Sequence, residues 1–170
     1  RQGPDGGVYH KVNSRDWPSL TVAPSDDNAE KFIMPVSSTA TADVAAVMNL
    51  AAYVFSGTQR DADTVLAKKY AQVAHNADLF LSKNPQLIML EDKYNGYEYG
   101  GPYTDENDQD ERLLADISSA WQGQSLSQDQ KQTLLAISAT PRFGDTAPDW
   151  MNVNFLSVFS ALLIPEKDAK

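Results

Sequence analysis

The sequence has no cysteine and only two histidines, His10 and His75, which lie far apart in the chain. This composition argues against a zinc site or a cysteine nucleophile, because both need cysteines or several histidines that meet. No glycine-rich phosphate loop, G-x-S-x-G elbow or H-E-x-x-H motif occurs either. The lack of cysteine leaves the redox compartment open. His75 falls within a predicted helix, where we expect a structural or solvent-exposed side chain.

Basic residues are few, with 14 lysines and arginines against 23 aspartates and glutamates and a formal net charge of -9. Phosphate binding needs basic patches, so we expect no nucleic-acid partner and no attraction to anionic membranes. Apolar stretches long enough to span a bilayer, about 20 residues, are also missing. No charged region followed by an apolar signal opens the chain.

The 170 residues are about enough for one domain with a substantial core. The chain opens at Arg1, in "RQGPDGGVYHKV", which is typical of one element running into a turn. We therefore expect residues 1–170 to be a fragment of something longer.

Helical periodicity dominates after an irregular, proline-rich start that has short extended candidates at 8–12 and 32–36. The first predicted helix, 37–55, is apolar on nearly every face, which is typical of a buried helix. The predicted helices occupy residues 37–55, 61–83, 108–121, 125–138 and 150–163. No strand pattern persists, so we predict an all-α fold of about five helices with long irregular loops. The helices come in antiparallel pairs, and a closed or partly closed helical toroid fits them better than a repeat solenoid.

The stretch "GGPYTDENDQDER", residues 100–112, places five carboxylates in seven positions. Asp110 shares the inward helix face with Leu114 and Ile117, and Glu111 lies within one turn of that face. Acidic residues in a first helical turn interact favourably with the helix macrodipole, which is one interpretation. A hard-cation site is the other, since calcium accepts carboxylates, amide oxygens and loop carbonyls. The spacing is not that of an EF-hand.

Four tyrosines, Tyr94, Tyr97, Tyr99 and Tyr103, lie within ten residues, and glycines are interspersed among them. Such aromatics can form a small satellite core, or they can stack on the apolar faces of sugar rings. His10 follows a Gly-Gly turn that could present it in a cleft.

Three ordered motifs resemble glycoside hydrolase family 9, a cellulase family built on an (α/α)6 barrel. They are "PDGGVYHKV", "FIMPVSSTATADVAAVMNLAAYVF" and "GGPYTDENDQDERLLADISSAW", and together they cover about residues 3–122. "PDWMNVNFLSVFSALL" continues the match with the family's W-x-D-V helix. The subgroup most similar to this sequence carries an immunoglobulin-like domain before the barrel.

The resemblance implies roles for five residues. His10, in the family's His-Lys motif, and Tyr103 would bind the sugar substrate along one cleft. Asp110 and Glu111 would be calcium ligands together with nearby loop carbonyls. Asn152 would be a further ligand, at a position where the family usually has aspartate. The remaining acids of the run, Asp105, Glu106 and Asp108, are expected to be mostly solvated.

The resemblance also has departures. The family's D-A-G-D aspartate pair, which activates water, and the glutamate that protonates the leaving oxygen are both absent from this sequence. Inverting hydrolysis needs both groups, so we expect this segment alone to be inactive. Leu114 replaces a tryptophan of the family pattern, and Asp116 replaces a small residue.

The resemblance implies that residues 1–170 are an internal segment of the glycoside hydrolase catalytic domain of a longer enzyme. The function that it implies is inverting hydrolysis of β-1,4-glucan by an endoglucanase or cellodextrinase. An exo-β-glucosaminidase or β-glucosidase of the same family is one alternative, and a non-catalytic carbohydrate-binding or scaffold protein is another. The expected partners are an oligo- or polysaccharide and the remainder of the catalytic domain. The expected location is secreted or periplasmic, or cytoplasmic for an exo-enzyme that processes oligosaccharides.

Overall fold

The structure is a computed structural model of the whole chain. It describes residues 1–15, 18–58, 60–90, 93–94, 97–98, 105–139, 148–149 and 151–164, and the following statements concern those residues.

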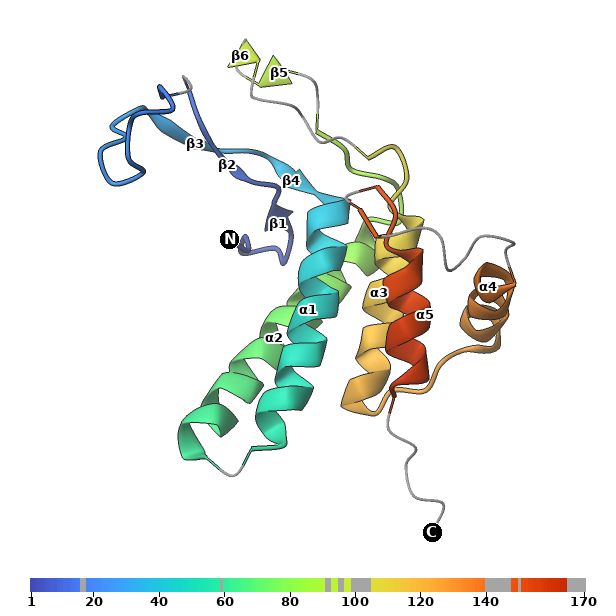
Figure 1. Cartoon of the computed structure of the whole chain (residues 1–170). Coiled ribbons are helices and arrows are strands. Elements are labelled where there is room, and N and C mark those ends of the chain that lie inside the picture. The colour runs from blue at the N-terminus through green and yellow to red at the C-terminus, as the bar shows by residue number, and fades with distance from the viewer. Residues whose placement is uncertain are drawn as a thin grey trace.

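Five α-helices and one short 3-10 helix make up most of the described chain (Figure 1). The helices are α1 (Ser38–Ser56), α2 (Asp61–Lys83), α3 (Gln109–Ser119), η1 (Ala120–Gln122), α4 (Gln128–Ser138) and α5 (Asn154–Leu162). The helical class and the number of helices agree with the sequence prediction. The last helix begins at Asn154 rather than near Trp150, because residues before it form a tight turn instead.

Local signals in the sequence explain where the helices begin and end. The Ser37 side chain accepts a hydrogen bond from the Ala40 amide and so caps α1. Ser127 and Gln130 form a reciprocal capping box at the start of α4. Asn84, which precedes a proline, ends α2. Such capping residues can be recognised in the sequence, which is why most of the helix boundaries lie close to the predicted ones.

The N-terminal residues form short antiparallel strand pairs, in the region where extended segments were predicted. Strand β1 (Val8–Tyr9) pairs with β4 (Val36–Ser37), and β2 (Val12–Ser14) pairs with β3 (Lys31–Ile33). The β2–β3 ribbon extends away from the helices (Figure 1). A third pair, β5 (Lys93–Tyr94) and β6 (Tyr97–Glu98), forms a small hairpin after α2.

Helix α1 packs against α2 and α3, and α3 packs against α5. Figure 1 shows that α1, α3 and α5 run in the same direction and begin at the same end, whereas α2 runs the opposite way. Small side chains allow this close packing, since alanines dominate the contact between α1 and α2. The main core cluster consists of Ala42, Ala45, Ala46, Ala77, Leu81, Leu114, Ala115 and Val153. Leu114 is therefore accommodated in the core, and Asp116 lies exposed.

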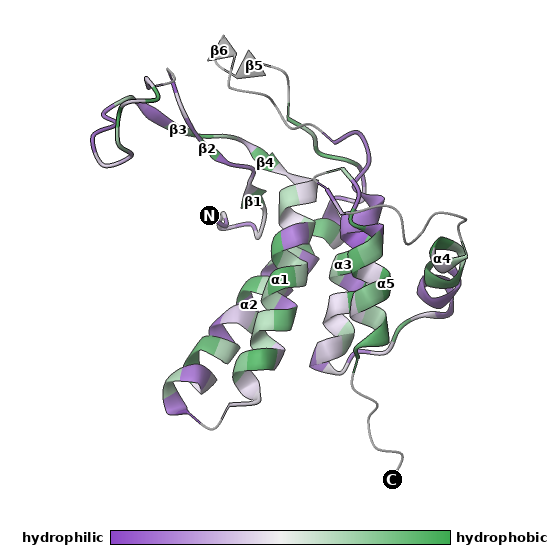
Figure 2. Cartoon of the chain, viewed as in Figure 1, coloured by the Kyte–Doolittle hydropathy of each residue, from purple (hydrophilic) through white to green (hydrophobic). Residues whose placement is uncertain are grey.

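Helix α1 is not covered on every side, contrary to the prediction of an all-round buried helix. Val47 and Val54 are 56% and 61% exposed because no described element packs against that face. On α5, Phe159 and Leu162 are also exposed. Figure 2 shows hydrophobic residues along much of α1 and α5 and hydrophilic residues at the start of α3. Among the described residues, no helix is both long enough and apolar enough to cross a membrane.

Candidate functional site

The starts of α1, α3 and α5 meet the end of β1 around an acidic cavity of about 230 Å³. We call it the acidic cavity. It is lined by His10, Thr39, Ala40, Asp43, Asp105, Glu111, Asp149 and Val153. Four of these eight residues are acidic and they come from three separate parts of the sequence, so the fold concentrates negative charge at this end of the helices.

His10 lies in the wall of this cavity, directly after β1. Its backbone amide donates to the Pro35 carbonyl at 3.0 Å, and its ring Nδ1 lies 2.8 Å from the Ser37 hydroxyl. Ser37 is also the N-cap of α1, so the imidazole is fixed relative to the start of that helix. Burial and the neighbouring Lys11 lower the pKa of His10, which keeps the ring neutral at pH 7.

Tyr103, the second predicted substrate-binding residue, lies outside the described residues. The backbones of Tyr94 and Tyr97 are described, and these two residues are register partners in the β5–β6 pair.

The two predicted calcium ligands on α3 are buried, with 4% of Asp110 and 2% of Glu111 exposed. Asp110 accepts a hydrogen bond through Oδ2 from the Val153 amide at 2.7 Å, which fixes the start of α5 against the start of α3. Its Oδ1 and the Oε2 of Glu111 have no hydrogen-bond partner among the described residues. Burial of a carboxylate oxygen without a partner costs free energy. We therefore expect each of these two oxygens to bind a further group or a proton.

Asn152, the third predicted ligand, lies exposed in the turn before α5. Its side-chain Oδ1 accepts from the Asn154 amide at 3.1 Å and from the Asn154 side chain at 3.2 Å. Its carbonyl accepts from the Asp149 amide at 3.2 Å. The described contacts of Asn152 therefore shape the turn, and the neighbouring acid Asp149 is the one that lines the cavity.

Two further acids of the run are buried, contrary to the expectation that they would be solvated. Asp105 and Asp108 are 6% and 5% exposed, whereas Glu106 is exposed as expected. Asp108 pairs with Arg112, whose Nε donates to it at 2.8 Å. Asp105 accepts from the Asn107 amide through Oδ1 at 3.0 Å, and its Oδ2 has no partner among the described residues.

Burial and mutual repulsion raise the pKa values of the acids around the cavity. The pKa of Glu111 rises to about 8, mainly through burial and then through Asp110 and the other acids. The pKa of Asp43 rises to about 6 for the same two reasons, although its side chain keeps some exposed surface facing the cavity. Burial also raises the pKa of Asp105. These groups therefore resist ionisation unless a positive charge joins them.

Sequence reasoning did not identify Asp43 and Asp149 as site residues. Asp43 carries a signal in the sequence, because it is the one acidic residue in the otherwise apolar helix pattern of residues 37–55. Asp149 lies outside any helix in the turn before α5, with Oδ1 accepting from the Met151 amide at 2.8 Å. No periodicity predicts where such a side chain points.

The arrangement fits a cation that takes oxygen ligands more closely than it fits acid–base catalysis on a polymer. Glu111 is 2% exposed and cannot reach a polysaccharide chain. Among the residues that the structure describes, no three acidic, histidine or cysteine side chains converge in the way a metal site of such ligands requires. Calcium can also be held by two carboxylates with amide and backbone oxygens, and the unpaired oxygens of Asp110 and Glu111 fit such a role.

No family model matches the chain. Endoglucanase D of Acetivibrio thermocellus is 30% identical over 164 residues, which is 95% of this chain and 25% of that protein. A solved metagenome-derived glycoside hydrolase family 9 endoglucanase matches with a TM-score of 0.75 and 26% identity, covering 98% of this chain and 29% of that one. A solved thermostable endoglucanase from Alicyclobacillus acidocaldarius matches with a TM-score of 0.76 and 27% identity, and the match covers 96% of this chain and 29% of that one. The chain thus spans about a quarter of the length of Endoglucanase D.

Proposed function

Because the chain belongs to glycoside hydrolase family 9, we propose that it is a segment of an inverting β-1,4-glucan hydrolase of the endoglucanase or cellodextrinase type. The observation that carries the proposal is the match over nearly the whole chain to solved endoglucanases, one of them named as a member of that family. The matched proteins are named as glucan hydrolases, so neither a glucosaminidase nor a non-catalytic protein is favoured.

In this proposal the chain contributes one wall of a substrate cleft and does not contribute the reacting groups. Inversion needs an acid and a base about 6.5–9.5 Å apart, with water between the base and the sugar. Of the acids around the cavity, Glu111 and Asp105 do not suit that task, because both are buried among other carboxylates. The catalytic carboxyl groups would come from other parts of the complete protein, and this segment alone would be inactive.

His10 and Tyr103 would bind the sugar. A neutral imidazole can both donate to and accept from hydroxyl groups, and the lowered pKa of His10 supports that state. The contact with Ser37 orients the ring before substrate arrives, which reduces the cost of binding. Tyr103 would offer an aromatic face to a sugar ring.

Calcium would be held by Asp110, Glu111 and Asn152 with loop carbonyls, and it would serve a structural purpose. It would neutralise carboxylates that lack partners and would fix the start of α3 next to the start of α5. The exposed apolar residues of α1 and α5 would be covered by the remainder of the same catalytic domain. A hydrolase of polymeric glucan meets its substrate outside the cytoplasm, so the complete protein would be secreted or periplasmic.

The test is an assay of the complete protein on cellodextrins and, separately, on glucosamine oligomers. We expect cleavage of cellodextrins. Activity only on glucosamine oligomers would replace the glucanase assignment with the glucosaminidase one, and inactivity on both would support a binding protein. The isolated 170-residue chain is the matched negative control.

A further inference from the structure

We propose that Arg112 is a positioning residue that holds together the two ends of the tyrosine segment, which we define as residues 86–108. This segment carries Tyr94, Tyr97, Tyr99 and Tyr103. The contacts of Arg112 stand independently of any function. Its effect on sugar binding rests on the function proposed above.

The C-terminal end of the segment meets Arg112 through Asp108. The Arg112 Nε donates to Asp108 Oδ2 at 2.8 Å, and the two side chains are 20% and 6% exposed. Asp108 is the residue that directly precedes α3, and Asp105 and Asn107 form a turn just before it. The ion pair therefore fixes the point at which the tyrosine segment enters α3.

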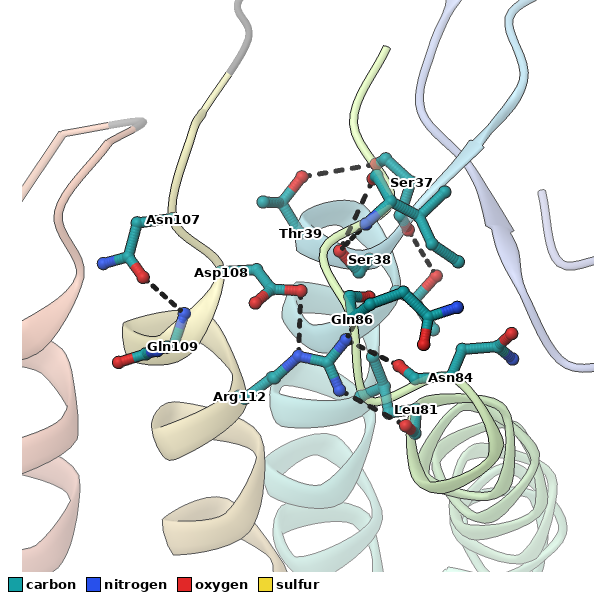
Figure 3. Close-up of polar contacts among 12 residues, drawn as sticks. Ser37, Ser38, Thr39, Leu81, Asn84, Gln86, Asn107, Asp108, Gln109 and Arg112 are labelled. Carbon is teal, nitrogen blue, oxygen red and sulfur yellow. Dashed lines mark hydrogen bonds and ion pairs between the residues drawn. The ribbon is translucent and has the colours of Figure 1, made fainter.

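The N-terminal end meets the same guanidinium. Nη2 of Arg112 donates to the Asn84 carbonyl at 2.9 Å and to the Gln86 carbonyl at 3.3 Å, and Nη1 donates to the Leu81 carbonyl at 3.2 Å. Figure 3 shows the side chain reaching from α3 to these three carbonyls. Leu81 lies in the last turn of α2 and Asn84 is the C-cap of that helix, where the negative end of the helix dipole attracts a cation.

A second set of contacts fixes the same end of the segment to α1. The Ser38 amide donates to the Ile88 carbonyl at 2.9 Å, and the Ile88 amide donates to the Ser38 hydroxyl at 2.9 Å. Ser38 is fully buried. The N-terminal end is thus held from two sides, by Ser38 on α1 and by Arg112 on α3, while Arg112 also holds the C-terminal end.

This contact pattern needs arginine in particular. The guanidinium carries five donors in a rigid plane, so one side chain can serve a carboxylate and several carbonyls at once. A lysine ammonium could keep the pairing with Asp108 but could not span the same set of acceptors.

Holding both ends matters because a long segment between two helices loses much conformational freedom when it binds a ligand. Fixing its ends beforehand reduces that loss. If the tyrosines bind sugar, removal of Arg112 should weaken substrate binding more than it slows the chemical step, because the reacting groups lie elsewhere.

The experiment uses the complete protein with Arg112→Gln, Arg112→Lys and the control Arg60→Gln. Arg60 makes a comparable Nε contact with Asp63 at 2.7 Å, but at the opposite end of α2. Hydrogen exchange is followed by mass spectrometry for peptides covering 84–108, and KM and kcat are measured on cellotetraose.

For Arg112→Gln we expect about tenfold faster exchange across residues 84–108 and about a tenfold higher KM, with kcat changed less than about threefold. Arg112→Lys should recover part of both effects, and Arg60→Gln should match the parent protein. Unchanged exchange in Arg112→Gln would overturn the proposal.

Faster exchange with an unchanged KM would overturn the claim that Arg112 strengthens sugar binding, but it would support the claim that Arg112 holds the ends of the tyrosine segment. A parent protein inactive on cellotetraose would refute the proposed function, while the exchange result would still decide the role of Arg112. If Arg112→Gln does not fold, Asp108→Asn replaces it. Faster exchange at the C-terminal end alone is then expected, and no change would overturn the proposal.

Discussion

Asp105 and Asp108 lie three positions apart before α3 and are almost equally buried, yet they are compensated very differently. Asp108 receives the Arg112 guanidinium, which also satisfies three backbone carbonyls. Asp105 faces the acidic cavity with Glu111, and each keeps one oxygen without a partner among the described residues. The chain itself therefore compensates the buried charge of Asp108 with a guanidinium. The carboxylates at the cavity must instead be neutralised by protons or by a bound cation.

The largest expected effect concerns pH and calcium at the cavity. The folded state raises the pKa of Glu111 to about 8 and that of Asp43 to about 6, so it favours their neutral forms. The contribution of these groups to the free energy of unfolding is therefore fully present below about pH 4. It is lost as the pH rises through about 8, and for Glu111 the loss is up to about 5 kcal/mol.

Metal-free complete protein should therefore melt at a higher temperature at pH 5 than at pH 8.5. Calcium at a hundred times its Kd should restore about 2.7 kcal/mol at pH 8.5, and chelation should reverse this. A metal-free protein whose Tm changes with neither calcium nor EDTA would contradict the calcium assignment.

The next effect concerns the paired carboxylate. Arg112→Met in the complete protein should cost about 3 kcal/mol of the free energy of unfolding, because it leaves Asp108 buried with an uncompensated charge. Urea unfolding measures it, and Arg60→Gln is the control, with a smaller expected loss because Asp63 keeps its hydrogen bond from Thr58. Equal losses in the two variants would show that burial of the Asp108 pair has no special cost.

Glu111→Gln should separate the two explanations for the unpaired oxygens. The amide keeps the shape and removes the charge, so the metal-free variant should gain about 2 kcal/mol at pH 8.5 relative to the parent. The same change should abolish the stabilisation by calcium. A variant that still responds to calcium as the parent does would remove Glu111 from the set of ligands.

The smallest effect distinguishes the two residues of the turn before α5. Asn152→Asp should strengthen calcium binding about tenfold, or about 1.4 kcal/mol, if Asn152 is a ligand as proposed. Calorimetric titration of the variant against the parent measures the change, with Asp149→Asn as the matched comparison. Weaker binding in Asp149→Asn together with no change in Asn152→Asp would assign the ligand role to Asp149 instead.

The helices were largely predictable from the sequence because their boundaries depend on local signals. Asp61–Lys83 was predicted at its observed bounds, since a turn precedes it and Asn84 with the following proline ends it. The start of α5 was predicted too early, because the amide of Val153 binds Asp110 on another helix. That contact is nonlocal and leaves no periodicity in the sequence.

The site was only partly predictable for the same reason. Helical spacing correctly placed Asp110 on the inward face of α3, and Glu111, predicted within one turn of that face, is buried as well. It could not show that Asp105 and Asp108 would be buried as well, because their burial depends on where the end of α2 and the start of α1 lie. The substrate role of His10 came from the resemblance and stays a prediction, although the structure puts His10 in the cavity wall.

The central claim is that this chain forms part of an inverting β-1,4-glucan hydrolase. It is tested most directly by following the hydrolysis of cellotetraose by the complete protein with proton NMR, in the first minutes before mutarotation. The account predicts that the newly formed reducing end appears first as the α-anomer. Initial formation of the β-anomer, or no cleavage at all, would contradict it.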